Sequence, residues 1–165
     1  MQFLAIDSTG HYSSVGFFEQ SNNKLSINAY RNNFLGKQKN FSINTLISDL
    51  IKNISFENLE FIVVSIGPGS FTKIRSSLSF AKGLSFGLEV PVIGINGFNK
   101  LYDVSKTFKQ DNTGLLMICD TFRKSRFVSL QNIDNNKSFN SKINIISKDD
   151  IKNVEKICSF EKIAV

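Results

Sequence analysis

The sequence predicts an α/β protein with mixed sheets, built from two lobes of which the second is abbreviated. Three observations support this prediction. Runs rich in β-branched and aromatic residues alternate with helix-length segments, strand-like runs return after those helices, and the polar stretch 109–114 separates the two groups. We therefore expect a first lobe over residues 1–108 and a shorter second lobe over residues 109–165.

The first lobe opens with three expected strands. Residues 3–7 and 13–19 are joined by a turn, and residues 24–31 continue the meander. The segment 41–54 then places its isoleucines and leucines at helical spacing, opposite threonine, serine, aspartate and lysine. This pattern predicts an amphipathic helix.

A parallel strand-helix-strand unit follows. The run 61–66 is typical of a strand buried on both faces, and Gly-Pro-Gly ends it. Ser70 is the expected N-cap of a helix over 71–88, which Gly87 helps to end before a strand over 91–95. Such a unit places its two strands parallel in one sheet.

The remaining elements are expected to be short. A helix precedes the lobe boundary, and a second meander, a helix and a terminal strand-like run follow it. Their residues are 98–108 for the first helix, 115–120, 126–133 and 142–147 for the strands, 148–158 for the second helix and 162–165 for the last run.

Composition limits the classes of function. The net charge of +6 would suit a polyanionic partner, but lysine and arginine are spread among asparagine and serine, so a solvated basic surface is the simpler interpretation. Cys119 and Cys158 form neither a zinc spacing nor a disulfide framework, which favours a reducing compartment. No stretch approaches the roughly 18 apolar residues of a membrane span. We expect a cytoplasmic protein without membrane contact.

Two loops invite comparison with phosphate-binding sites. GPGSFTK lacks the consecutive Gly-Lys-Ser/Thr of a Walker loop, so a tight strand-to-helix turn is the simpler interpretation. Asp7, Ser8 and Thr9 after the first strand resemble the first phosphate loop of actin-like ATPases, where a carboxylate holds hydrated magnesium. The second such loop is missing, because Asp120 is followed by Thr and Phe. We therefore treat residues 7–9 as a vestigial nucleotide loop.

The sequence offers no catalytic or metal-binding set. His11 is the sole histidine, so neither a histidine-based metal centre nor a Ser-His-Asp relay can be assembled. Asp149 and Asp150 at an expected helix start complement the helix dipole better than they form paired acids. We assign no catalytic residue and no metal ligand.

The helix expected over 71–88 carries many small residues. On a wheel of about 100° per residue, Leu78, Ala81, Ser85 and Leu88 lie within about 40° of Ile74 and form the expected sheet-facing side. The opposite side contains two glycines, each costing up to about 1 kcal/mol relative to alanine, which indicates a close approach by a second helix. The expected partner interface on this helix comprises Ser76, Ser79, Phe80, Gly83, Phe86 and Gly87. The alternative is a contact with the chain's own helix 41–54 alone.

These same residues resemble a known family. GPGSFTKIRSSLSFAKGLSFGLEVPVIGIN, together with LAIDST, is similar to the bacterial TsaB family, also called YeaZ, whose core motif runs Gly-Pro-Gly-Ser-Phe-Thr-Gly-Ile-Arg and then Ala-Lys-Gly-Leu. The resemblance covers roughly the first 100 residues. It implies an actin-like, ribonuclease H-like fold in two lobes.

The resemblance also implies a function. It implies a non-catalytic scaffold for a related TsaD-like catalytic subunit, joined by a TsaE-like ATPase. That assembly adds a threonylcarbamoyl group to the adenosine following the anticodon of tRNAs that read codons beginning with A. The family's contact with the catalytic subunit maps to residues 41–54 and 71–88, which adds Leu46 and Leu50 to the expected partner interface. A homodimer through the same face is left open. We expect no cofactor in this chain alone, ATP or ADP and a metal ion in the partner subunits, and tRNA contact only through the complex.

Two other functions stay open at this point. One is a free-standing actin-like ATPase or sugar kinase, and the other is a degraded remnant without function. Departures from the family pattern bear on this choice: Lys73 replaces the motif's third glycine, Asp-Ser-Thr stands where Asp-Thr-Ser is usual, and Phe122 replaces an arginine. The family's His-Ser-Glu ahead of the first helix is also missing.

Overall fold

The computed structural model places most of the first lobe and part of the second. The chain forms two compact units, Met1–Gly97 and Phe98–Val165. The expected lobe boundary between residues 108 and 109 lies outside the described residues and stays a prediction, as do the helix 148–158 and the run 162–165. The structure describes residues 1–32, 43–52, 54–105, 114–120, 125–132 and 143–147.

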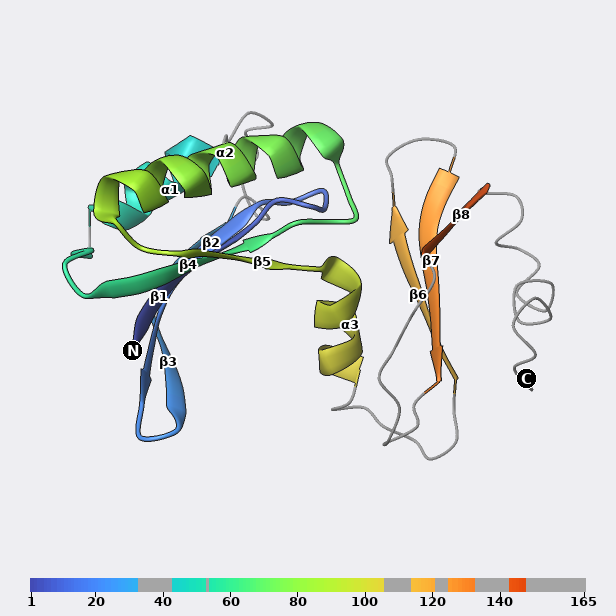
Figure 1. The fold of residues 1–165 in the computed structure, drawn as a ribbon, viewed down its shortest axis with the longest axis horizontal. Helices are drawn as coiled ribbons and strands as arrows, with labels where there is room; N and C mark the ends of the chain where they lie inside the picture. Colours follow the sequence, from blue (N-terminus) through green and yellow to red (C-terminus); the bar gives the residue numbers. More distant parts are fainter. Residues whose placement is uncertain (33–42, 53, 106–113, 121–124, 133–142, 148–165) are drawn as a thin grey trace. The chain divides into compact units, whose positions relative to one another are not determined.

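The first unit contains a mixed five-stranded sheet in the order β3-β2-β1-β4-β5 (Figure 1). β1 pairs antiparallel with β2, and β2 with β3, while β1, β4 and β5 run parallel. The expected meander and parallel unit are therefore both present. The strands are β1 (Gln2–Asp7), β2 (Ser14–Ser21), β3 (Lys24–Asn32), β4 (Leu59–Ser65) and β5 (Val92–Ile95).

Two helices lie on one face of this sheet, α1 (Ile43–Ile51) and α2 (Phe71–Leu88) (Figure 1). Strand residues alternate between the sheet's two faces, so Leu4 and Ile6 of β1 point to the core under the helices and their neighbours do not. The core consists of Leu4, Ile6, Val15, Phe17, Ile43, Leu46, Ile47, Leu50, Leu59, Ile62, Val64 and Ala81.

Aromatic rings pack across neighbouring strands on the opposite face of the sheet. The ring of Phe3 stacks on Phe18 at 5.2 Å and on Phe61 at 5.1 Å between centroids. Such cross-strand aromatic pairs stabilise a sheet beyond their buried area. The β2–β3 hairpin turns through Asn22 and Asn23, both with positive φ, as a two-residue hairpin requires.

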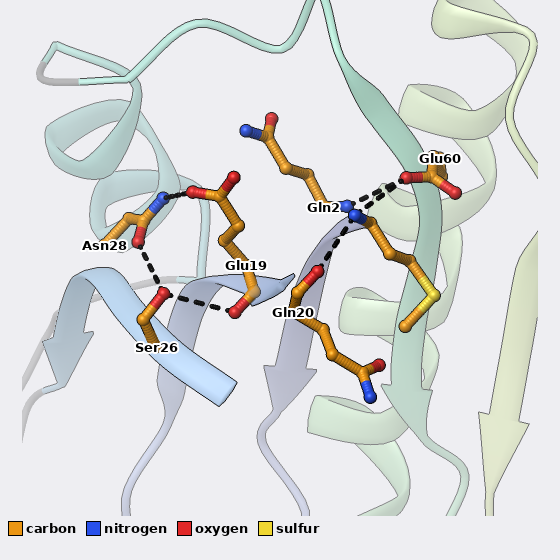
Figure 2. A network of polar contacts seen from close by, with 7 residues as sticks. Gln2, Glu19, Gln20, Ser26, Asn28 and Glu60 are labelled. Carbon is orange, nitrogen blue, oxygen red and sulfur yellow. Dashed lines mark hydrogen bonds and ion pairs between the residues drawn. The ribbon is translucent and has the colours of Figure 1, made fainter. Parts of the chain in front are cut away.

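Polar contacts connect neighbouring strands close to the N-terminus (Figure 2). Glu60 accepts a hydrogen bond from the Gln2 amide at 3.1 Å, and its carboxylate lies 3.4 Å from the Met1 amino group. Glu19 accepts a hydrogen bond from the Asn28 amide group at 3.1 Å. Both carboxylates therefore form contacts between neighbouring strands.

α2 begins and ends near the expected residues, with different capping. Ser70 occupies the N-cap position, but its hydroxyl makes no cap hydrogen bond; its amide donates instead to Thr9 O at 2.9 Å. At the other end the left-handed residue is Glu89, at φ 55°, and Gly87 lies inside the helix. Ser85 Oγ donates to Val90 O at 2.6 Å and fixes the chain that leaves the helix.

The second unit is described through its backbone. α3 (Gly97–Ser105) begins at the last residue of the first unit, one residue before the helix expected over 98–108, and overlaps that helix up to residue 105. β6 (Gly114–Asp120), β7 (Ser125–Asn132) and β8 (Ile143–Ser147) form an antiparallel sheet in that order, as the sequence predicts. Among the described helices, none combines the length and apolar composition needed to cross a membrane.

Candidate functional site

The small residues of α2 form an exposed surface. Ser76, Ser79, Gly83 and Gly87 are all exposed, and a Cβ added at either glycine would meet no described atom within 4 Å. No atom of α1 therefore lies within 4 Å of a Cβ at either glycine, so the described residues do not support the alternative of a contact with that helix alone. The stripe exposes helix backbone to solvent. A solvent-facing side that only had to stabilise the helix would carry residues of higher helix propensity than glycine.

The buried side of α2 is rotated from the predicted one. Ser77 and Ala81 are fully buried, whereas Leu88, expected to face the sheet, is exposed. On the wheel the buried side is therefore centred about 40° from Ile74. The difference arises because Ser77 counts as polar in any hydrophobic pattern, yet its hydroxyl can donate to the carbonyl of Lys73 or Ile74, both at 3.1 Å, and needs no outside partner.

Two residues of the expected interface belong to the core, and a third packs against it. Leu46 and Leu50 are 4% and 0% exposed, and Phe80 is half-buried against the same cluster. α1 has one apolar side, and the sheet already covers it. We correct the interface for Leu46 and Leu50, which support α1 from below. The candidates that stay predictions are the half-buried Phe80 and the exposed Ser76, Ser79, Gly83, Phe86 and Gly87.

Two large aromatic side chains flank the stripe. Phe86 is 90% exposed and Phe71 is 71% exposed, so both keep most of their apolar surface in water. The Arg75 guanidinium lies 5.1 Å from the centre of the Phe71 ring, a cation–π contact. Phe71 was not among the residues expected at the interface, although its place on the wheel, about 60° from Ile74 on the side away from the core, could have indicated it.

The turn after β1 is closed by its own hydrogen bonds. Asp7 Oδ1 accepts from the Thr9 amide at 3.0 Å and from Thr9 Oγ1 at 2.8 Å. Ser8 and Thr9 are buried, and Ser8 Oγ donates to Lys73 O at 2.9 Å. The vestigial nucleotide loop thus uses its carboxylate and hydroxyls to hold its own shape.

The Gly-Pro-Gly turn packs directly against this loop. A Cβ on Gly69 would overlap the Thr9 carbonyl, and Gly67 has a φ of 102° that side chains rarely adopt. These glycines therefore permit a close backbone approach, which supports the tight-turn interpretation over a phosphate-binding loop. The first helical turn of α2 is pinned by this approach.

Lys73 makes a second connection between the two segments. Its ammonium donates to Gly10 O at 3.2 Å and to His11 O at 2.7 Å, across more than sixty residues of sequence. The loop presents carbonyl oxygens to a cation here, whereas a phosphate site presents amides. Within the described ranges, no group of three or more His, Cys, Asp or Glu residues is placed to hold a metal ion.

Comparison with known proteins decides the family. The family model described as "TsaD: tRNA N6-adenosine threonylcarbamoyltransferase" matches residues 36–164. The chain belongs to this family. Its TsaB-type resemblance is confirmed by curated relatives named "tRNA threonylcarbamoyladenosine biosynthesis protein TsaB": one from Buchnera aphidicola subsp. Schizaphis graminum, 33% identical over 95 residues, and one from Escherichia coli K12, 29% identical over 98 residues.

These relatives are longer than the chain. The matches cover 56% and 58% of this chain but only 43% and 40% of the two TsaB proteins, so the chain spans less than half of their length. A solved structure titled "YeaZ from Pseudomonas aeruginosa" matches with a TM-score of 0.63 at 16% identity, covering 86% of this chain and 66% of that one. The actin-like α/β fold class expected for this TsaD-family chain is confirmed.

Proposed function

We propose that this chain is a docking subunit, without catalysis of its own, of the machinery that places a threonylcarbamoyl group on tRNA adenosine. The exposed stripe of α2 carries the proposal, because Gly83 and Gly87 leave open space beside the exposed Phe86. Two TsaB relatives are named for tRNA threonylcarbamoyladenosine biosynthesis, and the proposed reaction is taken from these names. The partner proposed for the stripe is a TsaD-like catalytic subunit.

Finer parts of this proposal follow the family resemblance. A TsaE-like ATPase would join the pair, tRNA would be reached through the complex, and nucleotide and metal would be held by the partner subunits. The target would be the adenosine after the anticodon in tRNAs that read codons beginning with A. A homodimer through the same stripe would compete with the catalytic subunit for α2, and a cytoplasmic location stays a prediction.

The substitution Gly83→Leu tests the docking surface. The new side chain would point into open space, and leucine favours a helix by roughly 0.8 kcal/mol over glycine, so the melting temperature should be unchanged or slightly raised. A close helix contact, however, would be overpacked by about 1 to 3 kcal/mol. Affinity for the TsaD-like subunit, measured by calorimetry, should fall roughly fivefold to more than a hundredfold.

Two outcomes would contradict the proposal. Parental affinity in Gly83→Leu would show that the stripe is not the contact. Unchanged tRNA threonylcarbamoylation after depletion of the chain in its native cell would show that the subunit is dispensable, which is the remnant alternative.

A further inference from the structure

α2 is charged with one sign only. Residues 71–88 hold three basic side chains and no acidic one. Lys73 is used inside the unit, since Gly10 and His11 bind its ammonium. Arg75 and Lys82 are exposed, on the same side of the helix as Phe86, and no ion pair in the described part of the chain neutralises either of them.

The acidic groups of the first unit lie elsewhere. Glu60 faces the N-terminal amine, Asp49 pairs with Lys52 at 2.8 Å, and Glu19 binds Asn28 (Figure 2). Glu89 follows the helix at its C-cap, about 10 Å along the axis from Lys82 at 1.5 Å per residue. That distance is close to the screening length of physiological salt, so Glu89 does little to neutralise the middle of α2.

The positive charge of α2 affects a homodimer and a complex with a different protein in different ways. In an antiparallel twofold pair of identical helices that cross at Gly83, residues beside the crossing point lie on the same side as their own copies, so Lys82 would lie near Lys82. Like charges held close at an interface disfavour the pair, and a carboxylate in the same place favours it. The same residue therefore opposes a second copy of the chain and attracts an acidic partner.

We infer that Lys82, with Arg75, is a specificity determinant of the α2 surface, selecting a partner helix that carries carboxylates over a second copy of this chain. The inference rests on the proposed docking through Gly83 and adds the charge that the partner must present. The exposed Phe86 supplies apolar contact to either occupant, so charge is what separates them.

Charge reversal tests the inference. Lys82→Glu should keep the parental melting temperature, since Lys82 is exposed, but should weaken binding to the TsaD-like subunit about tenfold at low salt. A mixture of Lys82→Glu with the parent should dimerise more tightly than either protein alone, as measured by sedimentation. Lys82→Gln should give an intermediate loss, and raising the salt should weaken the parental complex.

Lys24→Glu is the matched control, because it makes the same charge change on the exposed edge strand β3. It should leave affinity within about twofold. A loss as large as that of Lys82→Glu would show general electrostatic attraction and overturn the inference. Parental affinity in Lys82→Glu, with loss in Gly83→Leu, would overturn the charge preference and leave the docking surface standing; parental affinity in both would remove the docking surface itself.

Discussion

Lys73 shows how one side chain can change the role of a loop. The core motif that this sequence resembles has glycine at this position, and here a lysine ammonium bonds to the carbonyls of Gly10 and His11. Ser8 Oγ connects the same two segments in the opposite direction, because it donates a hydrogen bond to Lys73 O. The turn after β1 is thereby joined to α2 through side chain and backbone together.

Removing the Lys73 ammonium should loosen this turn. Lys73→Met keeps most of the side-chain length and loses both hydrogen bonds, which we expect to lower the free energy of unfolding by about 1 to 2 kcal/mol. Chemical denaturation measures the change, and hydrogen exchange should quicken at residues 9–12. Lys24→Met is the control and should change neither; an equal effect of both would show that lysine charge in general, rather than this contact, stabilises the unit.

Asp49 and Lys52 give a second prediction, for pH. The hydrogen bond from Lys52, and then its charge, lower the pKa of the Asp49 carboxyl below its ordinary value. A carboxyl with a depressed pKa stabilises the fold above its unfolded pKa, and that stabilisation is lost as pH falls through the folded one. NMR titration should find a higher Asp49 pKa in Lys52→Met than in the parent; equal values would show that the pair does not persist in solution.

At the scale of the element, α1 and α2 differ in which of their sides are buried and which are left open. α1 buries its one apolar side against the sheet. α2 buries Ser77 and Ala81 and leaves its opposite side, with Gly83 and Phe86, uncovered among the described residues. The small residues on the two sides of α2 therefore have different explanations. Those on the buried side allow close packing against the sheet, and those on the opposite side leave an open surface.

A pair of enlargements separates these two sides. Ala81→Leu adds volume at a fully buried position and should destabilise the unit by about 1 to 3 kcal/mol, seen as a lower melting temperature. Gly83→Leu, two residues away, should not lower it. If both variants melt at the parental temperature, the placement of Ala81 in the core is wrong.

The order of the elements could be predicted from local patterns, and the rotation of α2 could not. β-branched runs and helical periodicity fixed the strands β1 to β5 and the limits of α2 to within about two residues. Burial of Ser77 depends on hydrogen bonds within its own helix, which a hydrophobic pattern cannot register. The Lys73 contact was also invisible, because it joins residues 62 and 63 positions apart.

At the scale of the whole molecule, the family match includes the stripe but not the closed turn. The family model covers residues 36–164, which contain the stripe of α2, whereas the turn after β1 precedes that range, and both features lie in the first unit, Met1–Gly97. The first unit could be predicted well because its strands and helices are long and regular. The interface expected at Leu46 and Leu50 from the family resemblance was wrong, because both side chains are buried and a helix with one apolar side cannot serve both a sheet and a partner.

The closed turn predicts that the purified chain does not turn over ATP. Asp7 Oδ1 is bonded to Thr9, and the carbonyls of Gly10 and His11 bind the Lys73 ammonium, so the turn presents hydrogen-bond acceptors where a phosphate site presents amides. Phosphate release should stay at the buffer rate with and without magnesium. Turnover that disappears in Asp7→Ala would instead support the ATPase or sugar kinase alternative.

The exposure of Phe86 has an optical consequence. The chain contains no tryptophan, so Phe86→Trp would place a single indole at a side chain that is 90% exposed. Its emission would be that of an indole in water when the protein is free, and would shift to shorter wavelength when a partner removes that water. A ring left uncovered by the fold thus gives α2 a built-in position for a fluorescent reporter, with which association could be followed in real time and without an added dye.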